Sequence, residues 1–145
     1  LPPTAGYLAK DHIRLQDELG LLTEPLDAEL EAADRGQAAV LGFLRDRGFL
    51  TEDEPTTEQI VLALHRYLAA TPARVLCAAL PDAVGDRKTQ NQPGTWQEYP
   101  NWRIPLSHPD GTPMTLEELY TDQRALRLAG VMNEFSTPPL SRAGL

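Results

Sequence analysis

Hydrophobic residues recur at every third or fourth position in the first half of the chain, and this spacing predicts three helices. They cover residues 8–19, 26–48 and 57–71. Thr56 and Gln59, at the start of the third helix, have the spacing of a capping box. The first half of the chain is therefore expected to be helical.

The pattern changes at residues 75–80, VLCAAL, where every position is apolar. A continuous apolar run between Pro72 and Pro81 is typical of a parallel strand that is covered on both faces, so we expect a buried strand at about 74–80. A lone strand cannot satisfy its own backbone groups, and no other segment has a convincing strand pattern. Its partner strands are expected to lie outside this chain. The alternative is that the run belongs to a helix.

A polar connection rich in proline and glycine follows, far longer than an ordinary loop. Its residues 90–103, QNQPGTWQEYPNWR, hold both tryptophans of the chain. Amides, Arg103 and flat rings are groups that recognise sugars, so this segment is expected to face a ligand. The alternative is that Trp102 and Tyr99 pin the loop to the body of the protein.

The last part of the chain has a second capping-box pair, Thr115 and Glu118, which predicts closing helices before a frayed tail. A buried strand, a long loop at its carboxyl end and a helix form the unit of (β/α)8 barrels, whose active sites lie on such loops. The chain is thus expected to belong to the α/β class.

Composition and charge narrow the function mainly by exclusion. The chain has 145 residues, of which 41% are hydrophobic, as expected of one globular domain. Its net charge of -8, with acids and bases interspersed, argues against partners such as nucleic acid or an anionic membrane. No apolar run approaches the roughly 20 residues of a membrane-spanning helix. The single cysteine, Cys77, lies in the apolar run and is expected to be buried, which fits a cytoplasmic protein.

No set of residues has the spacing of a metal or catalytic centre. His12, His65 and His108 lack ligand-like spacing, and the acidic run 52–54 precedes a helix N-terminus, where negative charge is favourable without calcium. Glycoside chemistry requires a pair of carboxylates, and Asp82 is the only acid close to the end of the predicted strand. Neither a metal nor a catalytic pair is expected within this chain.

Four segments resemble one enzyme family. NQPGT at residues 91–95 and EYPNWR at 98–103 resemble the Asn-x-Pro-Gly-Thr and Asn-Trp-Arg signature of the bacterial 4-alpha-glucanotransferases, also called amylomaltases or disproportionating enzymes. LPPTAGY at residues 1–7 resembles the segment directly after the Thr-His-Asp motif of that family, and LALHRYL at 62–68 resembles the helix before its last barrel strand. The resemblance spans nearly the whole chain.

This resemblance implies the C-terminal part of an elaborated (β/α)8 TIM barrel in a cytoplasmic enzyme that needs no cofactor. Enzymes of this family move an alpha-1,4-glucan segment from one maltooligosaccharide to another or to glucose, with retention through a covalent glycosyl-enzyme intermediate. Their nucleophile, acid/base and third aspartate lie before the position that matches Leu1. The chain is therefore expected to contain no catalytic residue, and to work only with the preceding part of the same enzyme.

The resemblance also assigns substrate-binding residues. Asn91 matches the active-site asparagine of the family. Pro93, Gly94 and Thr95 would shape the loop, and Asn101, Trp102 and Arg103 would brace it. The expected substrate-binding residues are Asn91, Pro93, Gly94, Thr95, Trp102 and Arg103.

The expected segments are a helical part after a barrel strand, the last barrel strand, an active-site loop, closing helices and a tail, at residues 1–72, 73–81, 82–112, 113–136 and 137–145. The alternative is a free-standing helical module that binds a sugar or a protein without catalysis, and in which residues 75–80 are helical.

Overall fold

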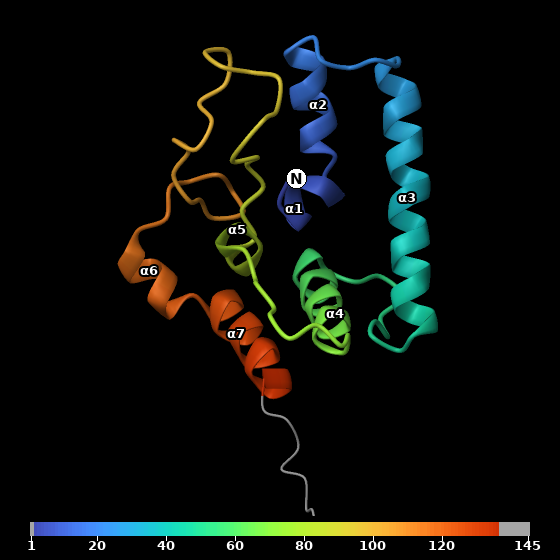
Figure 1. Cartoon of the computed structure of the whole chain (residues 1–145), viewed down its shortest axis with the longest axis vertical. Coiled ribbons are helices and arrows are strands. Elements are labelled where there is room, and N and C mark those ends of the chain that lie inside the picture. Colours follow the sequence, from blue (N-terminus) through green and yellow to red (C-terminus); the bar gives the residue numbers. More distant parts are fainter. Residues whose placement is uncertain (1, 137–145) are drawn as a thin grey trace, which may run out of the picture.

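The computed structural model describes residues 2–136, which form seven helices (Figure 1). They are α1 (Thr4–Leu8), α2 (Asp11–Glu18), α3 (Leu26–Asp46), α4 (Thr57–Ala69), α5 (Leu80–Val84), α6 (Leu116–Thr121) and α7 (Gln123–Ser136). The long α3 runs beside α2, and α4 lies at the centre in contact with α1, α3 and α7. An irregular loop, coloured yellow to orange, lies on the other side of α1 and α2 from α3.

The core forms where α3 and α4 meet. Leu44 of α3, Leu50 in the turn after α3 and Ala63 of α4 are buried together, and the burial of their apolar surface stabilises this junction. The start of α4 is fixed by the predicted capping box, since the Thr56 hydroxyl accepts a hydrogen bond from the N–H of Gln59 and the Gln59 side chain accepts one from the N–H of Thr56. The sequence prediction of this helix is confirmed.

The other helix predictions are confirmed with one change. The helix expected at 26–48 is α3, and Gly48, with φ 75°, has the left-handed conformation expected just after a helix end. The helix expected at 8–19 is α2, which begins only at Asp11 because Lys10 has φ 61°, and α1 before it was not predicted. A left-handed residue cannot continue a right-handed helix, so the chain turns there.

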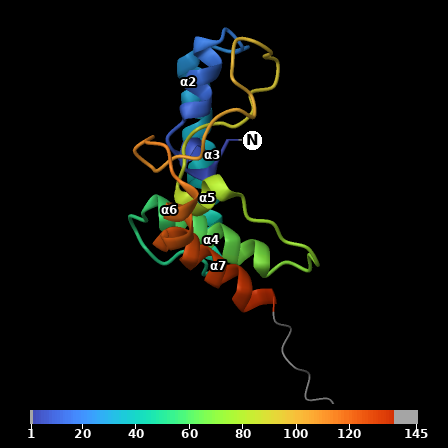
Figure 2. The same ribbon diagram turned by 90° about the vertical axis from the view of Figure 1, so that its left-hand side faces the viewer.

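Residues 75–79 have no regular secondary structure and pair with no strand among the residues that the structure describes. Figure 2 shows this yellow-green segment, between α4 and α5, running outside the helices. Val75 is 81% exposed and Cys77 is exposed as well. The predictions of a buried strand at 74–80 and of a buried Cys77 are therefore wrong for this chain by itself. An apolar run is covered only where neighbouring elements lie over it, and residues 2–136 supply none.

The helical alternative for the apolar run is also wrong, because only its last residue, Leu80, belongs to a helix. That helix, α5, occupies the start of the loop expected at 82–112 and has proline in its first turn. The rest of that loop contains one antiparallel bridge, between Ser107 and Pro113. The closing helices expected at 113–136 are α6 and α7, and the tail expected at 137–145 lies outside the described residues.

None of the helices within residues 2–136 has the length and apolar character needed to cross a bilayer.

Candidate functional site

The loop that follows α5 is anchored against α1 and α2. Arg87 binds the carboxylate of Asp11 with two hydrogen bonds, of 2.7 and 2.8 Å, and the N–H of Thr4 donates to Asp82 Oδ1 at 2.6 Å. A Cβ atom on Gly6 would lie 2.3 Å from the carbonyl oxygen of Arg87. Only glycine allows the two backbones to approach so closely. The start of the loop is therefore fixed beside the N-terminal turn of the chain.

A cavity of about 530 Å³ lies where the loop meets this turn. We call it the Asn91 cavity, and its lining residues are Pro2, Pro3, Thr4, Ala79, Pro81, Asp82, Gln90, Asn91 and Trp102. One wall comes from the N-terminal turn and α5, and the opposite wall comes from the loop. Its volume lies in the usual range of small-molecule sites.

Two asparagines of the loop have opposite environments. The amide of Asn101 is occupied, since its Oδ1 accepts from the N–H of Gln92 at 2.7 Å and its Nδ2 donates to Thr95 Oγ1 at 2.8 Å. The Asn91 side chain lines the cavity and has no hydrogen-bond partner within residues 2–136. An amide both donates and accepts, so Asn91 can bind a ligand hydroxyl while Asn101 holds the loop.

Trp102 is held in a strained backbone conformation beside Asn91. Its φ of 60° is a rare value for a bulky residue, and its N–H donates to the carbonyl oxygen of Gln90 at 2.8 Å. The indole is 76% exposed at the cavity. The alternative that Trp102 pins the loop to the body is therefore wrong. Strain of this kind is often found where a side chain is held for a ligand.

Tyr99 does stabilise the loop, although within the loop itself. Its hydroxyl donates to the carbonyl oxygen of Thr89, and its ring is half-buried. Burial, together with the negative charge of Asp86, raises the pKa of Tyr99 above its ordinary value. The phenol is therefore kept neutral and able to donate.

The remaining predicted site residues lie outside the Asn91 cavity. Gly94, with φ 87°, and Thr95, whose hydroxyl donates to the Gln92 carbonyl oxygen at 2.7 Å, form a turn of the loop. Arg103 is exposed, and its side chain has no partner among the described residues. The structure thus brings Asn91 and Trp102 together in one cavity and gives Gly94 and Thr95 a place in shaping the loop.

Pro93 lines a second, smaller cavity of about 310 Å³, which Asn91 and Pro2 also line. Here the rings of Tyr7 and His12 stack, with centroids 5.4 Å apart. Burial lowers the pKa of His12, although the Gly6 carbonyl and Asp11 act in the opposite direction. The sequence analysis missed this stacked pair as a neighbour of Asn91, because no local spacing relates residues so far apart in the chain.

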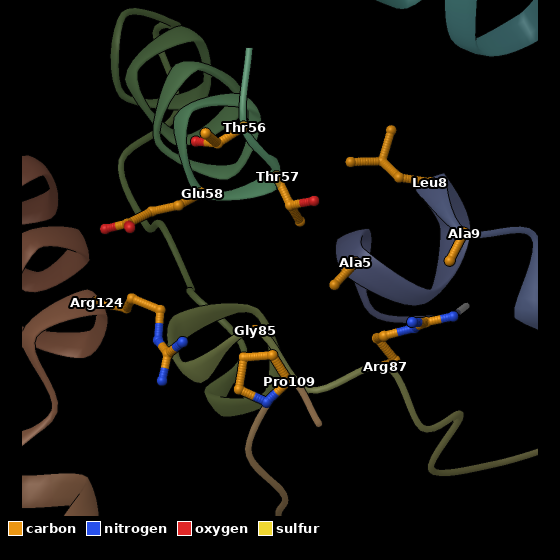
Figure 3. Close-up of a pocket in the computed structure, with 10 residues that line it drawn as sticks. All are labelled: Ala5, Leu8, Ala9, Thr56, Thr57, Glu58, Gly85, Arg87, Pro109 and Arg124. Atoms are coloured by element: carbon orange, nitrogen blue, oxygen red, sulfur yellow. The ribbon is translucent and has the colours of Figure 1, made fainter. Parts of the chain in front are cut away.

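A third cavity, of about 520 Å³, lies between α1, α4, α5 and α7 (Figure 3). Two arginines and one glutamate line it, and each already has a partner of opposite charge. The pairs are Arg87 with Asp11, Arg124 with Asp122, and Glu58 with Arg127. Because these charges are neutralised in place, the cavity presents no free ionic group, and we assign it no ligand.

The Asn91 cavity contains one carboxylate among its lining residues, that of Asp82. Retaining glycosyl transfer uses two carboxyl groups about 5 Å apart, one as nucleophile and one as acid. The cavity can therefore orient a sugar but lacks the pair that would cleave it. Among residues 2–136, no three His, Cys, Asp or Glu side chains are grouped so that they could hold a metal ion.

Comparisons with known proteins agree on one family. The sequence model of the 4-alpha-glucanotransferases matches residues 1–110. The chain is 58% identical over 142 residues to proteins of Mycobacterium bovis and Mycobacterium tuberculosis named 4-alpha-glucanotransferase. These matches cover 97% of this chain and 20% of each relative. The crystal structure of amylomaltase from Corynebacterium glutamicum superposes with a TM-score of 0.84 at 35% identity, over 91% of this chain and 20% of that chain.

Proposed function

Because the chain belongs to the 4-alpha-glucanotransferase family, we propose that it is one part of an enzyme that transfers alpha-1,4-glucan segments between maltooligosaccharides and to glucose. The chain spans about one fifth of the length of the relatives that it matches. The observation that carries the proposal is the Asn91 cavity, where a free amide and an exposed indole from the family-matched residues face the same space.

In this proposal the cavity holds a glucosyl unit. The amide of Asn91 exchanges hydrogen bonds with sugar hydroxyls, and the indole of Trp102 covers the apolar face of the ring. Gly94 and Thr95 shape the loop, and Asn101 keeps its turn closed around Thr95. Pro93 and Arg103 are the two other expected substrate-binding residues, and they lie in the loop outside the Asn91 cavity.

The bond-breaking groups belong to the part of the enzyme that this chain does not contain. A carboxylate there attacks the anomeric carbon and displaces the leaving oxygen, which a second carboxyl group protonates, and a covalent glycosyl-enzyme intermediate results. The second group then takes the proton of the acceptor hydroxyl, whose oxygen attacks that carbon and displaces the enzyme carboxylate, so that two inversions retain the original configuration. The contribution of this chain is to position the glucan.

The apolar segment 74–80 has a role in the same proposal. This largely exposed segment pairs with strands from the rest of the enzyme and becomes the last strand of the (β/α)8 barrel. The Asn91 cavity, which Ala79 lines near the end of that segment, would then lie at the carboxyl end of a barrel strand. Active sites of such barrels are found at this end.

The test uses disproportionation of maltotriose by the full-length protein. Asn91→Ala is expected to raise the KM for maltotriose and to lower kcat/KM by about tenfold, because a side-chain hydrogen bond to substrate is lost. Asn133→Ala, an exposed asparagine on α7, is the matched control and is expected to leave both constants unchanged. Unchanged disproportionation by Asn91→Ala would contradict the binding role, and a wild-type protein without transfer activity would contradict the reaction.

A further inference from the structure

Three residues join the two ends of the loop below Asn91 and Trp102. They are Asp86, Lys88 and Ser107, and we call them the loop clamp. The carboxylate of Asp86 accepts hydrogen bonds from two backbone N–H groups, those of Lys88 at 2.9 Å and of Ser107 at 3.1 Å. Both Asp86 and Ser107 are fully buried, with 0% exposure. One side chain therefore holds the outgoing and the returning arm of the loop.

The ammonium group of Lys88 closes the clamp from the other side. Its Nζ donates to Ser107 Oγ and to the carbonyl oxygen of Gly111, both at 2.9 Å. Gly111 belongs to the turn that leads into the bridge between Ser107 and Pro113. A buried carboxylate is costly unless its oxygens are satisfied, so this arrangement keeps the two ends of the loop at a fixed separation.

The clamp also connects the loop to the opposite wall of the Asn91 cavity. The N–H of Asp86 donates to the carbonyl oxygen of Pro81 at 2.9 Å, and Pro81 lines that wall in α5. The same residue thus contacts α5 through its backbone and the loop through its carboxylate. Asp86 therefore connects α5, which carries Pro81 and Asp82, to the base of the loop that carries Asn91 and Trp102.

We propose that Asp86, Lys88 and Ser107 are positioning residues, which fix the width of the Asn91 cavity and thereby the placement of the glucan. This inference rests on the proposed function, because it assigns the clamp a role in binding through Asn91. The clamp residues are not expected to touch the substrate, since none of them lines the cavity.

The test is a double-mutant cycle in the full-length protein, with maltotriose as the probe. Lys88→Met keeps an unbranched side chain and removes the bonds to Ser107 and Gly111. It is expected to lower kcat/KM about fivefold through KM, with kcat nearly unchanged, a normal size for coupling within one hydrogen-bond network. In an Asn91→Ala background the same change is expected to have little further effect. The control, Lys10→Met, removes an ion pair with Asp34 of α3, leaves the hydrogen bonds of the loop clamp intact and is expected to leave KM unchanged.

Hydrogen exchange of residues 90–102 gives a second readout that does not depend on activity. Lys88→Met is expected to speed exchange in this segment, whereas Lys10→Met is not. The proposed positioning role would be wrong if Lys88→Met lowered kcat/KM equally in the wild-type and Asn91→Ala backgrounds. It would also be wrong if hydrogen exchange of residues 90–102 were unchanged. If Asn91→Ala alone has no effect on transfer, the binding role of Asn91 fails, and the exchange data then decide by themselves whether the clamp orders the loop. Asp86→Asn replaces one carboxylate oxygen with an amide donor that faces a backbone N–H. In the folded protein it is expected to have a larger effect than Lys88→Met.

Discussion

The N–H of Trp102 donates a hydrogen bond to the carbonyl oxygen of Gln90, and this bond closes the loop while Trp102 has φ 60°. The two residues line the same cavity as Asn91. A bulky residue pays about 1 kcal/mol or more in this left-handed conformation, whereas glycine adopts it freely. The fold therefore tolerates strain at the residue that presents an indole to the cavity.

Replacing Trp102 with glycine is expected to have different effects on the stability of the protein and on its binding of maltotriose. Trp102→Gly is expected to leave the free energy of unfolding unchanged or to raise it by up to about 1 kcal/mol, because strain is relieved and little buried surface is lost. It is also expected to raise the KM for maltotriose several-fold, because the indole is gone. Trp96→Gly is the control, since Trp96 is 83% exposed and does not line the cavity. Loss of stability in Trp102→Gly greater than in Trp96→Gly would contradict strain at residue 102.

Gly6 and Gly42 form a matched pair of glycine positions. Gly6→Ala is expected to destabilise the protein by at least about 2 kcal/mol, because its Cβ would lie 2.3 Å from the Arg87 carbonyl oxygen and force the loop away from α1. Gly42→Ala, inside α3 with no neighbour within 4 Å, is expected to stabilise by about 0.5 to 1 kcal/mol. Urea denaturation of the full-length variants measures both. Equal effects of the two substitutions would show that the loop does not press on Gly6.

The stacked His12 predicts a pH dependence of stability. Burial lowers its pKa in the folded protein below the ordinary 6.5, so the unfolded chain binds the proton more tightly. The neutral His12 therefore gives its full contribution to stability above the pKa of the unfolded chain. This contribution is lost as the pH falls below that pKa toward the lower pKa of the folded protein. His12→Gln cannot titrate and is expected to show a smaller fall in urea midpoint between about pH 8 and about pH 5.5. An identical fall in both proteins would contradict a half-buried, neutral ring.

Cys77 reports whether segment 74–80 pairs with the rest of the enzyme. In the structure of this chain its thiol is exposed. In the full-length protein, with other cysteines replaced, the thiol is expected to resist a maleimide until the protein unfolds, because a barrel strand is covered on both faces. Val75→Cys in a Cys77→Ala background is expected to behave in the same way. Rapid labelling of both native proteins would rule out a buried strand.

The sequence predicts those elements whose causes are local. The capping boxes at Thr56 and Thr115 are confirmed because a cap depends on residues three positions apart. The sequence does not indicate helix α5, because Pro81 after an apolar run is typical of a strand end and is equally favoured in the first turn of a helix. The expected burial of Cys77 is wrong for the chain by itself because hydrophobicity indicates a tendency to be covered and does not identify what covers it.

The candidate site could be predicted only in part for a related reason. The loop and Asn91 follow from a local signature, and Asn91 and Trp102 do line one cavity. The other wall of that cavity depends on Thr4 and Asp82, which are 78 positions apart in the sequence. The two roles of Asn91 and Asn101, one free and one bound, also follow from tertiary packing alone, since both are amides in the same polar loop.

The bonds that anchor the loop have a consequence for how the protein is made. Thr4 and Asp82 are 78 positions apart, and Asp11 and Arg87 are 76 apart. Contacts of such long sequence separation form late, because a large loop must close before they contribute. During synthesis, α1 and α2 therefore leave the ribosome well before their partners have been translated. A nascent chain that stalls before α5 would contain its first two helices but neither Asp82 nor Arg87, and the cavity beside those helices would not form.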